Sequence, residues 1–179
     1  MNRKFFAFAA LASVLSINAA HAADGTINFT GELLAQTCTN TINGGVSPAT
    51  VVLPKISAGV LGAAGVVAGA TNFTIELTKC VGTATTAAAF FEAGTGVDPI
   101  TKNVRNTGAA ANVQLQLLDS AGNPIKAGDT SQTDATIGTK RMTLAGGAAV
   151  LPYAVQYIAT GVAGAGTVVG HVTYSINYQ

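Results

Sequence analysis

The amino-acid sequence predicts an all-β protein, and more narrowly a single β-sandwich domain. The first observation is that apolar residues occupy every second position near the C-terminus, which is the period of a strand with one buried face. The second is that several earlier segments alternate in the same way, whereas helix signals are scarce. The third is that clusters of Gly, Asn, Asp and Pro separate these segments, as turns separate short strands.

The C-terminal strand is the clearest predicted element, because its alternation extends over residues 166–179. Since the sequence ends with this strand, no later segment can pair beside it. We therefore expect its missing neighbour in the sheet to come from another protein chain. The apolar row consists of Val168, Gly170, Val172, Tyr174, Ile176 and Tyr178.

Earlier strands are expected wherever the alternation recurs. Phe73, Ile75 and Leu77, for example, share one face of their segment. Two glycine-rich stretches, 58–70 and 161–166, are predicted to be loops rather than a second domain, because 179 residues suit one domain. The predicted strands before the C-terminal one are residues 26–34, 51–54, 71–80, 87–93, 113–117, 137–144 and 150–160.

The first 22 residues are typical of a secretory signal peptide. Positive charge at Arg3 and Lys4 precedes an apolar stretch over residues 5–17, and Ala20-His21-Ala22 fits the small-x-small cleavage rule. An uncleaved membrane anchor is the alternative, but the apolar stretch is shorter than the roughly 20 residues that span a bilayer. We therefore expect an exported protein that begins at Ala23, with no membrane insertion of the mature chain.

Charge and composition exclude some classes of partner. Charged residues make up 9% of the sequence, and removal of Arg3 and Lys4 would leave seven basic against eight acidic residues. A nucleic-acid-binding domain needs a basic face, so no nucleic-acid partner is expected.

Export determines how the two cysteines are interpreted. Cys38 and Cys80 are an even number in an oxidising compartment, which predicts a disulfide. A metal site is not expected, because His171 would be the sole histidine of the mature chain. We expect His171 to be an exposed strand residue on the face opposite the apolar row.

No constellation of residues indicates catalysis. A single histidine supports no Ser/His/Asp set, and neither a P-loop nor a dinucleotide fingerprint is present. The carboxylates are scattered singly, without the pairing that glycoside hydrolysis requires. We therefore expect neither an enzyme nor a cofactor.

Several motifs in order give the chain a family resemblance. A short leading segment, 25–32, is followed by Cys38, and Cys80 ends the run Phe73-Thr-Ile-Glu-Leu-Thr-Lys-Cys. Residues 151–161, Leu-Pro-Tyr-Ala-Val-Gln-Tyr-Ile-Ala-Thr-Gly, and the ending with Gly166 and a penultimate tyrosine complete the set. Essentially the whole chain resembles the pilins of the chaperone–usher pathway, most closely the major subunits of type 1 fimbriae.

This resemblance implies an incomplete immunoglobulin-like β-sandwich that lacks its final strand and is completed in trans by a donor strand. Residues 1–22 would be the signal peptide, 23–32 the donor-strand extension and 33–179 the pilin domain. The implied partners are identical or homologous pilin subunits, a periplasmic pilus chaperone and an outer-membrane usher. The implied destination, reached through the periplasm, is a cell-surface fimbria that supports bacterial adhesion.

The resemblance also assigns roles to residues. The donor face would consist of Gly25, Ile27, Phe29 and Gly31. The acceptor groove and the chaperone contact would be formed by Gly166, Val168, Gly170, Val172, Tyr174, Ile176, Tyr178 and Gln179.

Alternatives to these roles remain open at the level of the sequence. Ile27 and Phe29 could belong to an ordinary first strand, and the terminal tyrosines to an ordinary core. The chain could also be a minor adaptor or tip pilin, or a pilin-like adhesin with its own receptor-binding surface. Lys140 and Arg141 have no assigned role, and a solvated face is expected for them.

Overall fold

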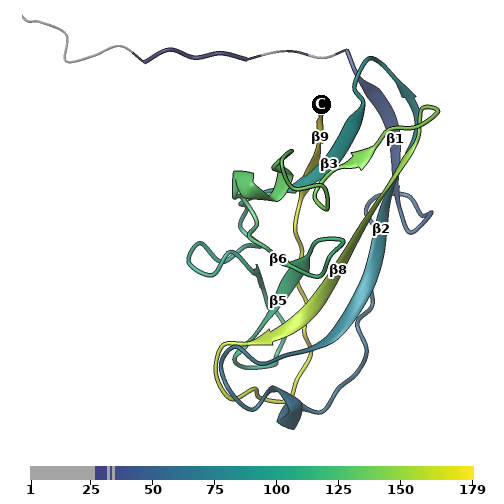
Figure 1. Ribbon diagram of the computed structural model, residues 1–179. Helices are drawn as coiled ribbons and strands as arrows, with labels where there is room; N and C mark the ends of the chain where they lie inside the picture. Colours follow the sequence, from purple (N-terminus) through teal and green to yellow (C-terminus); the bar gives the residue numbers. More distant parts are fainter. Residues whose placement is uncertain (1–26, 32, 34) are drawn as a thin grey trace, which may run out of the picture. The chain divides into compact units, whose positions relative to one another are not determined.

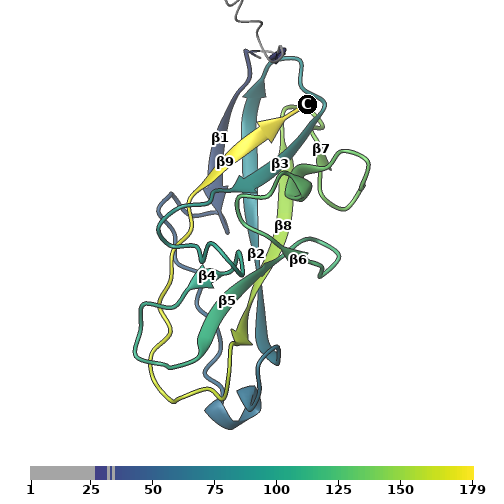
Figure 2. The same ribbon diagram turned by 90° about the vertical axis from the view of Figure 1, so that its left-hand side faces the viewer.

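The computed structural model describes residues 27–179 except 32 and 34, and its residues fall into two units, 1–32 and 33–179. Residues 33–179 form two antiparallel sheets (Figures 1 and 2). The predicted signal peptide, residues 1–22, lies outside the described residues. In the described part of the chain, no helix is both long and apolar enough to cross a membrane.

The larger sheet, sheet A, has the strand order β1-β2-β8-β5-β4, with β6 also pairing with β5. The smaller sheet, sheet B, has the order β7-β3-β9. The strands of sheet A are β1 (Thr37–Ile42), β2 (Val67–Val81), β4 (Val104–Arg105), β5 (Val113–Leu118), β6 (Pro124–Ile125) and β8 (Ala149–Ala159). Those of sheet B are β3 (Thr86–Phe91), β7 (Met142–Thr143) and β9 (Tyr174–Tyr178), and two short 3-10 helices are η1 (Ala58–Leu61) and η2 (Thr130–Thr133).

The core lies between the two sheets, where the predicted apolar faces meet. Phe73, Ile75 and Leu77 of β2 are all buried, as their alternation predicted. Phe91 of β3 connects the layers, because its ring packs edge-on against Tyr153 of β8 at a centroid distance of 5.1 Å. Such edge-to-face packing adds about 0.5–1.5 kcal/mol beyond the area that is buried. The expected β-sandwich is thus confirmed.

Four predicted strands are confirmed with small shifts of their ends: 71–80, 87–93, 113–117 and 150–160. The expectation of a loop throughout 58–70 is partly wrong, because β2 already begins at Val67. Gly69 marks a bulge in β2 rather than a loop, with a φ of +69° and a register shift against β8. A Cβ at this position would lie 2.9 Å from the ring of Tyr157.

Three predicted strands differ from the structure. The described residues of 26–34 contain no strand, and neither does 51–54, although Val51 and Leu53 are half-buried and Val52 is exposed. Of 137–144, only Met142–Thr143 is a strand. Before it the chain turns instead, since Asp134 accepts hydrogen bonds from the backbone and hydroxyl of Thr136.

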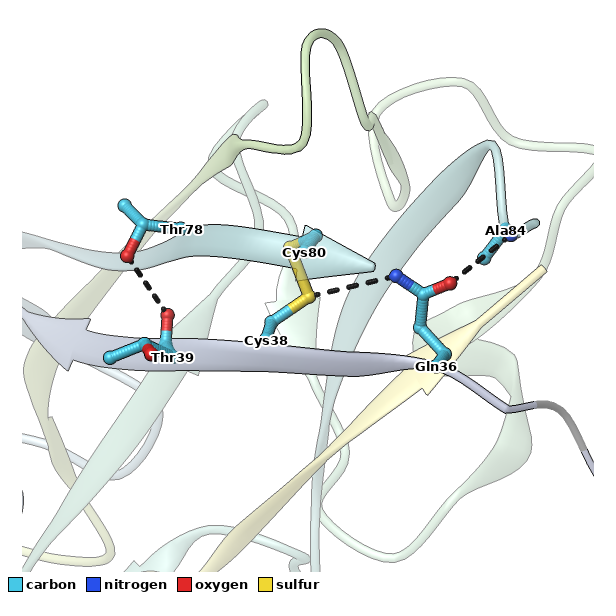
Figure 3. The surroundings of a disulfide bond; sticks show 6 residues. All are labelled: Gln36, Cys38, Thr39, Thr78, Cys80 and Ala84. Atoms are coloured by element: carbon cyan, nitrogen blue, oxygen red, sulfur yellow. Dashed lines mark hydrogen bonds between the residues drawn. A yellow bond between two sulfur atoms is a disulfide. The ribbon is translucent and has the colours of Figure 1, made fainter. Parts of the chain in front are cut away.

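The predicted disulfide between Cys38 and Cys80 is present and joins β1 to the end of β2 (Figure 3). Gln36 supports this corner: its amide nitrogen lies 3.8 Å from the Cys38 sulfur, and its side-chain oxygen accepts a hydrogen bond from Ala84 N at 3.2 Å. Gly82 leaves room for this side chain, because a Cβ there would lie 2.0 Å from the Gln36 oxygen. The start of β1 is therefore fixed both covalently and by hydrogen bonds.

Replacing both cysteines by alanine should lower the free energy of unfolding by roughly 4 kcal/mol, the loop-closure value for about 43 residues. Urea unfolding of the purified subunit measures this loss. Wild-type protein under reducing conditions is the control and should lose a similar amount. Equal stability of the oxidised wild type and the double variant would contradict the prediction.

Candidate functional site

The last segment of the chain keeps the predicted alternation over its whole length. Its odd-numbered residues from 169 to 179, His171 among them, are exposed, whereas the apolar side chains at even positions are half-buried and pack against the core. The half-buried members are Val168, Val172, Tyr174, Ile176 and Tyr178. These side chains face the core, but part of their surface remains accessible to solvent.

Only Tyr174–Tyr178 of this segment is a strand, so the predicted strand over 166–179 is too long. Its beginning lies beside the chain that follows β4, where Thr107 N donates to Val169 O at 2.7 Å. Its end pairs with β3, starting where Glu92 N donates to Thr173 O at 2.9 Å. The segment therefore passes from the edge of sheet A to sheet B, and residues 170–172 make no backbone hydrogen bond to any described residue.

Two glycines allow this passage. A Cβ on Gly170 would lie 2.8 Å from Arg105 O and 2.9 Å from a methyl group of Val104. A Cβ on Gly166 would lie 2.4 Å from Ala110 N. The glycines thus continue the apolar row where the segment packs too closely on β4 and its extension for a side chain to fit.

A groove with a volume of about 310 Å³ lies along this segment. One wall comes from the last segment, through residues 170–172 and Tyr174, and the opposite wall from Ile42 of β1 and the chain that follows it. Core side chains form the floor: Phe73, Ile75, Phe91, Val104, Leu115, Leu117 and Val155. The opposite wall is completed by Ser47, Pro48, Ala49, Thr50, Val51 and Leu53.

The strands on the two sides of the groove each have one edge without a strand partner among the described residues. β1 pairs only with β2, and β9 pairs only with β3. Unpaired strand edges present rows of N–H and C=O groups that bind another strand readily. The arrangement is therefore an apolar groove bordered by two hydrogen-bonding edges.

The tyrosines of the row stay uncharged at neutral pH. Partial burial raises the pKa of the Tyr174 and Tyr178 hydroxyls above the ordinary value. Tyr174 also packs on Phe91 with a ring-centroid distance of 6.5 Å. The two tyrosines thus add no charge to the apolar row.

Gln179 is tied to the sandwich through its main chain. Its carbonyl oxygen accepts hydrogen bonds from the backbone N–H groups of Thr85 at 2.7 Å and Thr86 at 2.8 Å. Its N–H donates to Thr86 O at 3.0 Å. The residue is exposed, and its expected contact with a chaperone stays a prediction.

Three predicted donor residues, Ile27, Phe29 and Gly31, belong to the unit 1–32, and Gly25 lies outside the described residues. Ile27 is 78% exposed and Phe29 is 90% exposed. A Cβ on Gly31 would meet no atom within 4 Å. The described donor residues thus form an exposed apolar pair beside a glycine.

Arg141 corrects the expectation of a solvated face. It is 9% exposed, and its guanidinium donates to Asn177 Oδ1 at 2.7 Å, to Asn177 O at 3.2 Å and to the Thr86 hydroxyl at 3.0 Å. Burial lowers the pKa of Arg141 from its ordinary value. Since Thr86 belongs to β3 and Asn177 to β9, Arg141 holds the last strand in place from outside the groove.

Its neighbour Lys140 is half-buried and donates to the main-chain oxygen of Ser131. Sequence reasoning missed the role of Arg141, because its partners are far away in the sequence and are not carboxylates. The available signal was the position of Arg141 within the predicted strand 137–144, in a chain with few charges.

Replacing Arg141 by methionine should lower the free energy of unfolding by about 1.5–3 kcal/mol, the range for hydrogen bonds to a charged group. The backbone amides of residues 174–178 should exchange with deuterium faster, because β9 loses its outer attachment. Lys140→Met is the matched control and should change both quantities less. Equal effects of the two substitutions would contradict this role for Arg141.

The groove and the two strand edges that border it define an open β-sandwich domain. Comparison with known proteins agrees with this architecture. The family model described as "Type-1 fimbrial protein, A" matches residues 53–179. The chain therefore belongs to the type-1 fimbrial protein family, as its motifs predicted.

Relatives support the assignment, and a solved structure shows the fold. The "Major fimbrial subunit SMF-1" of Stenotrophomonas maltophilia (strain K279a) is 44% identical over 171 residues, covering 90% of this chain and 96% of that protein. The "F17 fimbrial protein" of Escherichia coli is 40% identical over 170 residues, covering 92% of each. The crystal structure of the P pilus rod subunit PapA has a TM-score of 0.56 at 17% identity, covering 79% of this chain and 99% of that one, and shows the shared fold.

The family and the fold together define the role of the chain. It is a structural subunit of a fimbria, and its place is in a cell-surface fibre that assembles from such subunits. The expected family, fold class and structural role are confirmed.

Proposed function

We propose that this subunit polymerises by strand addition: residues 25–31 of one copy enter the groove of the next copy. The observation that carries the proposal is the groove itself, bordered by the unpaired edges of β1 and β9 and floored by core side chains. A strand inserted there gains hydrogen bonds on both sides. It also covers the half-buried apolar row that the subunit alone leaves accessible.

The leading segment has the residues that such a joint requires. Ile27 and Phe29 lie two positions apart, so in an extended chain both point to the same face. Their exposure leaves most of their apolar surface available for burial. Burying each side chain fully stabilises the joint by about 1.5–3 kcal/mol. Gly31, on the same face, allows close backbone approach.

An open groove also requires protection before assembly. We infer that residues 1–22 direct export and that a periplasmic chaperone occupies the groove first, with its contact extending to Gln179. An outer-membrane usher would then exchange the chaperone for the leading segment of the next subunit. The exposed apolar wall supports this step, because unprotected strand edges associate without control.

The fibre as a whole would support adhesion through its length and its surface. The alternative role is that of a minor adaptor or tip pilin, which would use the same leading segment and groove. Electron microscopy of cells overexpressing the subunit with its chaperone and usher distinguishes the two roles. Long rods of this subunit support the major role, and short tip elements alone support the minor one.

Phe29→Asp should abolish incorporation of the subunit as a donor, because it places a charge in an apolar groove. Asn28→Asp introduces the same charge on the opposite face of the leading segment and should assemble nearly as well as wild type. The yield of dissociation-resistant polymer on gels measures both variants. Normal polymerisation of the Phe29 variant, or of a chain lacking residues 23–32, would overturn the donor assignment.

Tyr178→Asp should weaken capture by the chaperone, because the charge would lie in the half-buried apolar row of the last segment. Thr173→Asp puts the same charge on the exposed face of the last segment and serves as the control. Co-purification of each variant with the chaperone from periplasm gives the comparison. Equal recovery of the two complexes would count against a groove shared by chaperone and subunit.

A further inference from the structure

The edge of β3 that faces away from β9 is only partly covered by a strand. β7 pairs with β3 at two positions, Thr86 and Ala87. Farther along, Ala89 and Phe91 have no strand partner on this side among the described residues. Without any other cover, this side of β3 would be a second open edge of sheet B, opposite the edge that borders the groove.

Gln132 occupies this edge in place of a strand. Phe91 N donates to Gln132 Oε1 at 2.8 Å, and Gln132 Nε2 donates to Phe91 O at 3.1 Å. A side-chain amide carries the same donor and acceptor as a peptide group. One residue thus reproduces the pair of hydrogen bonds that a neighbouring strand would make. Gln132 is 5% exposed, so these bonds are shielded from water.

Tyr153 bonds to the other N–H group of this edge that has no strand partner. Ala89 N donates to the Tyr153 hydroxyl oxygen at 2.9 Å. Burial raises the pKa of this hydroxyl, so it remains uncharged at neutral pH. Because Tyr153 also belongs to the aromatic core, the cover is fixed to the interior of the sandwich.

The segment that carries Gln132 is itself fixed in position. Asp129 caps η2 by accepting a hydrogen bond from Ser131 N at 2.9 Å. Gly128 has a φ of +79° and donates its N–H to Phe91 O at 2.8 Å. A Cβ on Gly128 would lie 2.3 Å from the side chain of Ala93, so only glycine allows this approach. Arg141 adds a hydrogen bond to Thr133 O at 3.3 Å.

We propose that Gln132 closes the second edge of β3 against strand addition, so that sheet B accepts an added strand only beside β9. The proposal rests on the proposed function, since it concerns where a donated strand can pair. Gln132 is then a residue that determines the site of assembly, without touching the donor. Exposed strand edges otherwise invite edge-to-edge association.

The test uses the full mature chain carrying Phe29→Asp, which prevents self-donation, with its groove filled by a synthetic peptide of wild-type residues 23–32. Gln132→Met keeps the length of the side chain but removes both hydrogen bonds. It should bind a second peptide or form dimers, whereas the parent chain stays monomeric with one peptide. Light scattering gives the mass, and hydrogen exchange at Phe91 should accelerate about tenfold or more.

Two further variants separate edge closure from a loss of stability. Gln116→Met removes an amide that accepts a hydrogen bond from Gln156 within sheet A and should remain monomeric. Gln132→Glu retains an acceptor for Phe91 N–H but introduces a charge, which blocks strand pairing at an edge. It should therefore be destabilised more than Gln132→Met and yet associate less. If, across these variants, the extent of association simply followed the loss in free energy of unfolding, the proposal would be overturned.

Hydrogen exchange of the parent chain tests the closure even if the Gln132 variants do not fold. The Phe91 amide should be protected, and exchange as fast as that of an exposed amide would overturn the proposal. The proposal would also be overturned if the Gln132→Met chain stayed monomeric and bound a single peptide. Failure of the parent chain to bind any peptide would instead contradict strand addition at the groove, while the protection of Phe91 would still report on Gln132.

Discussion

The structure depends on one constraint: the backbone N–H and C=O groups at the edges of a β-sheet need hydrogen-bond partners. The sandwich meets this need differently at each edge. β7 and the buried side chains of Tyr153 and Gln132 cover the outer edge of β3. The edges of β1 and β9 that border the groove have no strand partner in the described part of the chain. In the proposed assembly, the contrast between covered and open edges determines where another chain pairs with the domain.

The groove results from strands that are held firmly at its borders. The Cys38–Cys80 disulfide fixes β1 on one side, and Arg141 fixes β9 on the other through Thr86 and Asn177. Between these borders lies a floor of core side chains that the domain leaves accessible. A preformed groove of this kind binds an incoming strand without first having to order its own walls.

Alternation in the sequence predicted which side chains face the core, but it did not predict where strands end. Val51 and Leu53 belong to a predicted strand and Val172 to the predicted apolar row, and all three pack against the core, yet none lies in a strand. Side-chain periodicity reports the face that is buried, whereas a strand also needs a hydrogen-bonded neighbour. Both mismatches lie in the walls of the groove, where the neighbour is missing. These two segments thus depart from the pattern where a neighbouring strand is missing, whereas the mismatch at 137–144 lies outside the groove.

Other features could not be read from the sequence because they depend on tertiary contacts. Gln132 lies outside the predicted strands and Arg141 lies within the one at 137–144, and their partners Phe91 and Asn177 are 41 and 36 positions away. The disulfide was predictable, since only two cysteines were present in a chain expected to be exported. The donor residues Ile27 and Phe29 were identified through the family resemblance, and their role remains a prediction.

The passage of the last segment between the sheets also has a mechanical consequence. Its beginning is bonded next to β4 through Thr107 and Val169, and its end is bonded to β3 through Glu92 and Thr173. A tension applied along this segment is therefore divided between the two layers of the sandwich. Neither sheet can be peeled away from it alone, and bonds to both layers must yield before the segment leaves the domain. For a subunit that carries load within a fibre, this shared attachment resists extraction of the segment that lines the groove.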